Sequence, residues 1–310
     1  MAIMHQPLTG TASDNQRGIV LVLLGMAGFA IGDAFIKHLG GTMPLGQIVA
    51  VRGVMASIVL WAIVRVRSGG MPWRSLAHPL IALRAACEIG ATYCFLSALI
   101  LMPIANATAI LQAIPLTVTF FGSVFLGERV GWRRYTAIMV GLAGIVLIVR
   151  PGAEGLEDGA LFALATVGFS TARDLVTRRI PKELGSLPVV TVCTFAVTAM
   201  GCLWALGEGT VPIGAGDVAL LGLAALAMPV GLLCVAAAVR MGELAVVTPF
   251  RYSIFLWALV IGWVGFGEVP DALTLVGTAI VLGSGFYTLL REAKLNRDLA
   301  ARSGKRGAAV

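Results

Sequence analysis

Two stretches of sequence lying 140 residues apart decide the fold. Residues 98–128 read ALILMPIANATAILQAIPLTVTFFGSVFLGE, and residues 238–268 read AVRMGELAVVTPFRYSIFLWALVIGWVGFGE. They align without a gap, are identical at nine of 31 positions, and both end in Gly-Glu. Self-similarity at a fixed separation is the sequence signature of a repeated structural unit. We therefore predict that the chain is a duplication of two similar halves.

The composition of the chain predicts that both halves lie in a membrane. Of the 310 residues, 58% are apolar and 13% are charged, and the mean hydropathy is +0.91. An ordinary soluble domain is about 45–50% apolar and about 25% charged. The apolar runs are continuous rather than alternating, which is typical of spanning helices and not of a closed barrel. The composition excludes a soluble globule and a disordered chain.

The apolar runs predict an all-α integral membrane protein with ten transmembrane helices. The expected spans are residues 17–37, 44–66, 80–101, 105–126, 133–149, 158–178, 187–206, 217–239, 244–265 and 272–290. We expect a tail at 1–16, five-helix repeats at 17–149 and 150–290, and a basic tail at 291–310. Because five is odd, the two repeats insert with opposite orientation, as they do in many secondary transporters.

The basic residues predict the orientation. Cytoplasmic loops carry an excess of Lys and Arg. If residue 1 is cytoplasmic, 17 of the 23 Lys and Arg residues fall on that side, and only Lys37 and Arg150 fall outside. The remaining four lie within spans. Both termini are therefore expected in the cytoplasm, and the net charge of +7 reports orientation rather than a nucleic-acid partner.

The sequence has no motif of a catalytic, metal or ATP-binding centre. The five cysteines lie in apolar stretches without a C-x-x-C pair, and the three histidines are far apart, so we expect packing residues. There is no G-x-x-x-x-G-K-[ST] and no H-E-x-x-H motif. We expect no cofactor, no metal and no enzyme activity. An intramembrane enzyme or a non-transporting scaffold remains the alternative outside the transporters.

Several motifs resemble a known family of carriers. They are GERVGWRR at 127–134, VGLAG at 140–144, PFRY at 249–252 and FGEVPD at 266–271. In these motifs the chain resembles the drug/metabolite transporter superfamily, in its ten-span bacterial EamA branch. Ala137 and Ser284 stand where that family often has glycine.

The resemblance implies a carrier in a bacterial inner membrane that moves a small polar or amphipathic metabolite by alternating access. Uptake of a cofactor, vitamin or amino-acid-like compound, such as S-adenosylmethionine or riboflavin, is one reading. Export of amino acids or drug-like compounds is the other. The bilayer and a small-molecule substrate are the expected partners. Proton coupling, exchange and facilitated diffusion stay open, as do monomer and homodimer.

Charged residues inside the spans are the first candidate sites. They are Asp33, Arg52, Arg84, Glu88, Arg173, Asp174 and Arg251. Each costs about 2.5–3.5 kcal/mol on insertion scales and usually faces the bundle interior. Asp33 and Lys37 are four residues apart on one helical face, as are Arg84 and Glu88. Each pair is either an ion pair that eases insertion or part of a gate or coupling site.

Asp33 and Asp174 occupy related positions in the two repeats. Inversion would place one acid near each mouth of the carrier. Our hypothesis is that they belong to two alternating gates, with Lys37 beside Asp33 and either Arg173 or Arg178 beside Asp174. With Glu88, they are the only in-span carboxylates available for proton coupling.

A second group of candidates would bind the substrate directly. Arg251 and Tyr252 follow Pro249 in the ninth span, and Gln112 is the repeat counterpart of Tyr252. The planar fork of Arg251 suits a carboxylate or a phosphate-like group; otherwise it reaches the membrane surface or pairs with Glu88.

Four further residues complete the prediction. Arg52 is either a second contact for an anion or the partner of Asp33. Tyr93, Phe250 and Trp257 either stack on a flat ring of the substrate or face lipid and the protein core.

Overall fold

The computed structural model describes residues 12–68, 77–127, 131–151, 157–241 and 243–307, and every element in these ranges is a helix. The α-helices are α1 (Ala12–Gly40), α2 (Leu45–Ser68), α4 (Pro79–Leu101), α5 (Ile104–Leu111), α6 (Ile114–Phe125), α7 (Trp132–Val149), α8 (Asp158–Arg179), α9 (Ser186–Glu208), α10 (Ala215–Met241), α11 (Leu244–Val247), α12 (Ser253–Phe266) and α13 (Ala272–Gly307). Two short 3₁₀ helices are η1 (Lys182–Leu184) and η2 (Thr248–Tyr252). Ten segments are long and apolar enough to cross a membrane, so the predicted fold class and number of spans are confirmed.

The fourth and ninth spans are both discontinuous. The fourth breaks between α5 and α6, where Pro115 in the first turn of α6 has no N–H to continue the ladder. The ninth begins as α11, tightens into η2, and becomes α-helical again at Ser253. Gln112 ends α5, and its counterpart Tyr252 ends η2. The two spans therefore break at the same position in the alignment of the halves.

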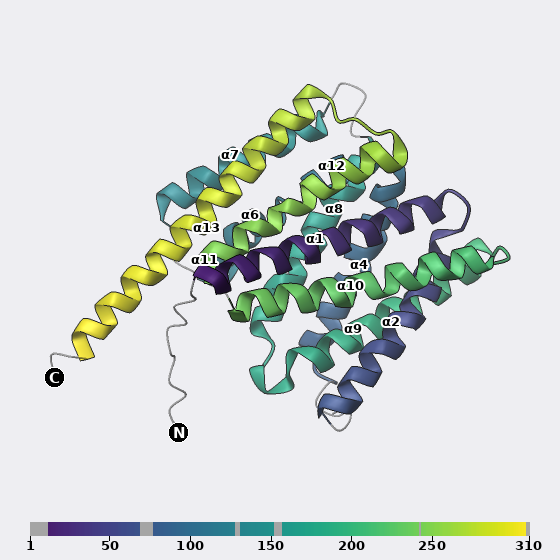
Figure 1. Ribbon diagram of the computed structural model, residues 1–310, viewed down its shortest axis with the longest axis horizontal. Helices are drawn as coiled ribbons and strands as arrows, with labels where there is room; N and C mark the ends of the chain where they lie inside the picture. Colours follow the sequence, from purple (N-terminus) through teal and green to yellow (C-terminus); the bar gives the residue numbers. More distant parts are fainter. Residues whose placement is uncertain (1–11, 69–76, 128–130, 152–156, 242, 308–310) are drawn as a thin grey trace.

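The main helix pairs each join one half of the chain to the other (Figure 1). α1 packs against α10, α2 against α9, α4 against α8, α7 against α13, and α5 against α12. In span numbers these are pairs 1–8, 2–7, 3–6, 5–10 and 4–9. Exchanging the halves replaces each span by its counterpart five spans away. This exchanges pair 1–8 with pair 3–6 and leaves pairs 2–7, 4–9 and 5–10 unchanged. The pairing is therefore unchanged by the exchange.

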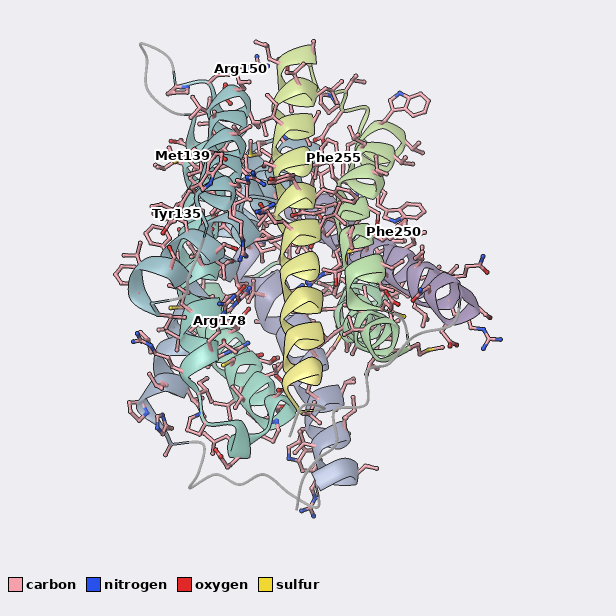
Figure 2. All side chains as sticks on the ribbon, turned by 90° about the vertical axis from the view of Figure 1, so that its left-hand side faces the viewer. Tyr135, Met139, Arg150, Arg178, Phe250 and Phe255 are labelled. Carbon is pink, nitrogen blue, oxygen red and sulfur yellow. The ribbon has the colours of Figure 1, made fainter. Side chains whose placement is uncertain are left out.

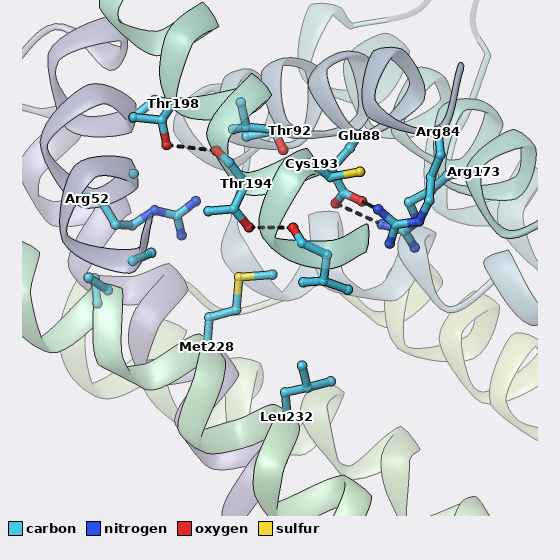
Figure 3. Close-up of a pocket in the computed structure, with 17 residues that line it drawn as sticks. Arg52, Arg84, Glu88, Thr92, Arg173, Cys193, Thr194, Thr198, Met228 and Leu232 are labelled. Atoms are coloured by element: carbon cyan, nitrogen blue, oxygen red, sulfur yellow. Dashed lines mark hydrogen bonds and ion pairs between the residues drawn. The ribbon is translucent and has the colours of Figure 1, made fainter. Parts of the chain in front are cut away.

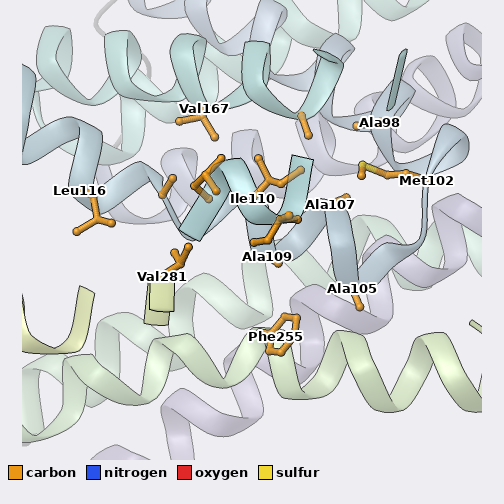
Figure 4. Close-up of a cluster of buried hydrophobic side chains, with 14 of the residues drawn as sticks. Ala98, Met102, Ala105, Ala107, Ala109, Ile110, Leu116, Val167, Phe255 and Val281 are labelled. Carbon is orange, nitrogen blue, oxygen red and sulfur yellow. The ribbon is translucent and has the colours of Figure 1, made fainter. Parts of the chain in front are cut away.

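The largest cluster of buried apolar side chains surrounds α5 (Figure 4). Ile110 is fully buried there and packs among Val167 of α8, Phe255 of α12 and Val281 of α13. The other inward positions of α5 include three alanines, and small side chains let neighbouring helices approach closely. α5 is thus enclosed by α8, α12 and α13 of the second half together with α4 and α7 of the first half.

α7 and α13 approach each other through a pair of glycines. A Cβ added at Gly144 would lie 2.8 Å from the carbonyl oxygen of Gly277, and one added at Gly277 would lie 2.7 Å from that of Gly144. These distances are shorter than a methyl group tolerates. The crossing therefore requires glycine on both helices.

We expect Gly277→Val to destabilise the protein by about 1–3 kcal/mol, because the added methyl groups force the two backbones apart. Gly283→Val on the same helix is the matched control, since a Cβ there meets nothing within 4 Å. Thermal unfolding in detergent measures both variants. Equal losses would contradict this account of the crossing.

The last helix extends beyond its expected end. The predicted span stops at residue 290, whereas α13 continues to Gly307 and projects from the bundle in Figure 1. The additional residues are rich in Arg, Ala, Leu and Lys and contain no proline. These residue types favour a helix without needing an apolar face, so an apolar run alone could not predict its end.

Candidate functional site

A cavity lies between α2, α4, α8, α9 and α10 (Figure 3). Its volume is about 210 Å³. The charged lining residues are Arg52 on α2, Arg84 and Glu88 on α4, and Arg173 on α8. Threonines of α4 and α9 and apolar side chains such as Met228 complete the wall. Charges enclosed in an otherwise apolar wall are the expected chemistry of a site for a small polar molecule.

Arg52 is the uncommitted charge of this cavity. Its side chain is partly buried and points into the cavity in Figure 3. Within the described part of the chain, its guanidinium has no hydrogen bond and no ion pair within 4 Å, and its electrostatic partner is Asp33 on α1. A guanidinium offers five N–H donors. Arg52 is therefore equipped to bind an anionic group of a ligand.

An ionic cluster forms the opposite wall. Glu88 lies 3.3 Å from Nη1 of Arg173 and 3.6 Å from Nη1 of Arg84. Arg173 donates from Nε to Asp174 at 2.9 Å, and Arg84 donates from Nε to Thr177 at 3.1 Å. The predicted Arg84–Glu88 and Arg173–Asp174 pairs are confirmed. Nη1 of Arg84 is buried with no hydrogen-bond partner, so a bound ligand could still use it.

The threonines of α9 present acceptors rather than donors to the cavity. Thr194 and Thr198 donate their hydroxyl protons to the carbonyl oxygens of Val190 and Thr194, at 3.0 and 2.8 Å. The oxygen of Thr198 also lies 3.1 Å from the hydroxyl of Ser57. Because the protons are engaged, the remaining lone pairs suit an ammonium or amide group of a substrate.

Lys37 forms an ion pair that the sequence did not predict. Its Nζ lies 2.7 Å from Oε1 of Glu268 and donates to the carbonyl oxygen of Met102 at 2.7 Å. The expected Asp33–Lys37 pair is wrong for the described residues. Glu268 follows Gly267, which ends α12 in a left-handed conformation with φ +67°, and its Oε2 accepts from the N–H of Ile104 at 2.9 Å. A partner 231 positions away is invisible to helical spacing.

Two more contacts between the halves lie at the same end of the bundle, which we call the Lys37 end. Gln47 of α2 donates to the carbonyl oxygen of Val211 at 2.8 Å and accepts from its N–H at 2.9 Å. The N–H of Gly46 donates to Glu208 at 3.0 Å. Since these contacts cross from the first half to the second, they hold the two halves together at the Lys37 end.

Arg150 and Asp271 form an exposed ion pair at the Lys37 end. Figure 2 shows Arg150 and Arg178 towards opposite ends of the bundle. The hydrogen bond from Arg150, with that from the N–H of Thr274, holds the pKa of Asp271 well below its ordinary value. Asp271 therefore stays charged at neutral pH.

Most of the predicted substrate-binding residues lie outside the cavity. The cavity lining includes Arg52, Arg84, Glu88 and Arg173 and omits Asp33, Lys37, Tyr93, Gln112, Asp174, Phe250, Arg251, Tyr252 and Trp257. Arg251 is exposed and does not pair with Glu88, whose partners are Arg84 and Arg173. Asp33 and Asp174 remain adjacent to the cavity through Arg52 and Arg173.

The aromatic candidates make packing contacts with the protein, although Tyr93 and Phe250 are 40% and 38% exposed. The ring of Tyr93 lies 4.7 Å from Trp204 and 6.1 Å from Phe162, measured between centroids. Trp257 packs against a buried cluster that includes Val22. These contacts favour the packing alternative for both residues. Phe250 is partly exposed.

Residues that sequence reasoning missed are those whose direction depends on packing. Thr194, Thr198 and Met228 line the cavity, although their types are common in any apolar span. Glu268 is different, because the Gly-Glu ending is shared by both halves. Because Glu128 and Glu268 occupy the same position in the two halves, their repetition could have indicated a structural or gating role.

A ten-span helical bundle with a charged cavity between its helices is the architecture expected of a polytopic membrane transporter. Residues 16–150 of the chain match the EamA-like transporter family. With this match and the relatives below, the chain is a membrane transporter and not an enzyme.

Three relatives illustrate the range of the family. The pseudopaline exporter CntI of Pseudomonas aeruginosa is 23% identical over 86% of this chain and 93% of that protein. The S-adenosylmethionine uptake transporter of Rickettsia bellii is 25% identical over 89% and 94%. The riboflavin transporter of Rhizobium johnstonii is 27% identical over 74% of each. A solved crystal structure, 20% identical over 91% of this chain and 98% of its own, has the same fold with a TM-score of 0.57.

Proposed function

We propose that this protein carries a small metabolite bearing an α-amino-acid group, by alternating access through the cavity. The observation that carries the proposal is the guanidinium of Arg52, which has no hydrogen bond among the described residues and faces the Glu88 cluster across one partly open cavity. An α-carboxylate would bind Arg52. The α-ammonium would bind Glu88 and the hydroxyl oxygens of Thr194 and Thr198.

Among the compounds named for the relatives, S-adenosylmethionine has this amino-acid group, whereas riboflavin has no ionised group at neutral pH. The cavity chemistry therefore favours an S-adenosylmethionine-type substrate. Sites for drug-sized ligands usually measure about 300–1,000 Å³, and this cavity of about 210 Å³ is smaller. The space suits the amino-acid end, so a nucleoside would require the cavity to open, as alternating access provides.

Two inverted repeats, 17–149 and 150–290, would provide the opposed motion. Three observations support this: the helix pairing is unchanged when the halves are exchanged, the discontinuous spans break at the same aligned position, and the family match covers 16–150. The distribution of basic residues supports a cytoplasmic location for both termini. The Lys37 end then faces the outside of a bacterial inner membrane.

Uptake and export remain the two directions, and the relatives carry names of both kinds. The energy would come from the substrate gradient, from exchange, or from protons through Asp33, Glu88 or Asp174. We propose uptake, with export of amino-acid-like compounds as the alternative.

Proteoliposomes test the proposal. Radiolabelled S-adenosylmethionine, methionine and riboflavin are offered to empty or preloaded vesicles, with and without a pH gradient. We expect saturable uptake of the amino-acid-bearing compounds and faster uptake into preloaded vesicles. Transport of riboflavin alone would contradict the substrate class. A folded protein that moves none of a wider panel would favour a non-transporting role. Arg65→Gln, an exposed change on α2, is the matched control.

A further inference from the structure

A second hollow lies on the outer surface, between α7 and α13. It measures about 420 Å³ and is lined by Trp132, Arg133, Thr136 and Val140 of α7 and by Tyr287 of α13, among others. Tyr135 and Met139 mark α7 in Figure 2. None of its lining residues belongs to the transport cavity. We call it the α7–α13 groove.

The groove changes from polar to apolar along α7. Arg133 lies in the first turn, Thr136 follows in the next, and Val140 lies about 10 Å deeper at 1.5 Å per residue. Trp132 and Tyr287 are 70% and 44% exposed. Amphipathic aromatic residues of this kind collect where a membrane meets water. The arrangement matches a lipid, with a polar mouth at the membrane surface and an apolar floor within the bilayer.

The mouth of the groove is positively charged. The guanidinium of Arg133 lies 5.4 Å from the centroid of the Trp132 ring, and no carboxylate pairs with it among the described residues. Arg291 follows Tyr287 by four residues on α13, which places both on one helical face. An anionic ligand is therefore favoured over a zwitterionic one.

We propose that the α7–α13 groove binds an anionic glycerophospholipid from the bilayer. The phosphate would lie against Arg133, held in place by Trp132, and an acyl chain would lie along Ala137 and Val140. In the predicted orientation this is the cytoplasmic leaflet, whose anionic lipids bind basic pockets between transmembrane helices. The inference is independent of the transported substrate.

Native mass spectrometry and lipid titration of the detergent-purified full chain test it, with phosphatidylglycerol and phosphatidylcholine as probes. We expect phosphatidylglycerol to be retained preferentially and Arg133→Gln to bind it about tenfold more weakly. Val140→Trp should also reduce binding, because it fills the floor and leaves the charge intact. Arg65→Gln, an exposed basic residue outside the groove, should bind as the wild type does.

Equal retention by the wild type, Arg133→Gln and Val140→Trp would overturn the proposal, as would retention without preference for the anionic lipid. A groove-dependent dimer that forms without lipid would assign the groove to a second copy of the chain and overturn it as well. Unfolding temperatures in lipid-free detergent establish that each variant is folded. If Arg133→Gln does not fold, Val140→Trp decides.

Discussion

Arg52→Gln is expected to weaken substrate binding by about 10- to 100-fold. Hydrogen bonds to charged groups contribute about 1.5–3 kcal/mol, and about 1.4 kcal/mol corresponds to a factor of ten in affinity. Arg52 has no competing hydrogen bond, so its donors are available to the substrate. The change should appear as a higher KM for amino-acid-bearing substrates in proteoliposomes.

Arg52→Lys separates the charge from the geometry at this position. Lysine keeps the positive charge beside Asp33 but loses the planar fork, so we expect transport between those of the wild type and Arg52→Gln. Arg65→Gln should transport normally, since Arg65 lies on the same helix outside the cavity. An unchanged KM in folded Arg52→Gln would show that the carboxylate binds elsewhere.

Glu268→Gln is expected to open the Lys37 end of the carrier. The side chains of Lys37 and Glu268 are only 10% and 19% exposed, so water weakens their attraction little. A hydrogen bond to a charged group contributes about 1.5–3 kcal/mol. Losing this contact should therefore shift the equilibrium between the closed and open states of the Lys37 end towards the open state by about 10-fold or more. Transport should slow, because closing this end is half of the cycle.

Labelling measures that shift. A cysteine introduced as Val49→Cys lines the cavity on the α2 side, and in a background without the five native cysteines it reports access from outside. We expect Glu268→Gln to accelerate its reaction with a membrane-impermeant maleimide. Arg150→Gln breaks a far more exposed pair, 43% and 52% exposed, and serves as the control with little effect. If both variants label at the wild-type rate, the buried pair does not hold this end closed.

The in-helix ion pair Arg84–Glu88 was predictable because four-residue spacing places both side chains on one face. The ten spans were predictable because each is a continuous apolar run. The side of each span that faces the cavity could not be predicted from the sequence. A lipid tail is as apolar as a protein core, so a helix that is apolar all round carries no periodic signal for its inner face. Thr198 and Met228 were missed for this reason.

The sequence by itself determined the membrane class, the number of spans and the short inventory of charges within them, because a long apolar run has few other uses. Tertiary structure decided which of those charges face one another. The fold pairs Lys37 of α1 with Glu268 after α12 and leaves Arg52 of α2 facing the cavity. Both outcomes depend on how α1 and α2 pack against helices of the second half, such as α12 and α9. Contacts between residues more than a hundred positions apart depend on the rotation of whole helices, which local spacing does not encode.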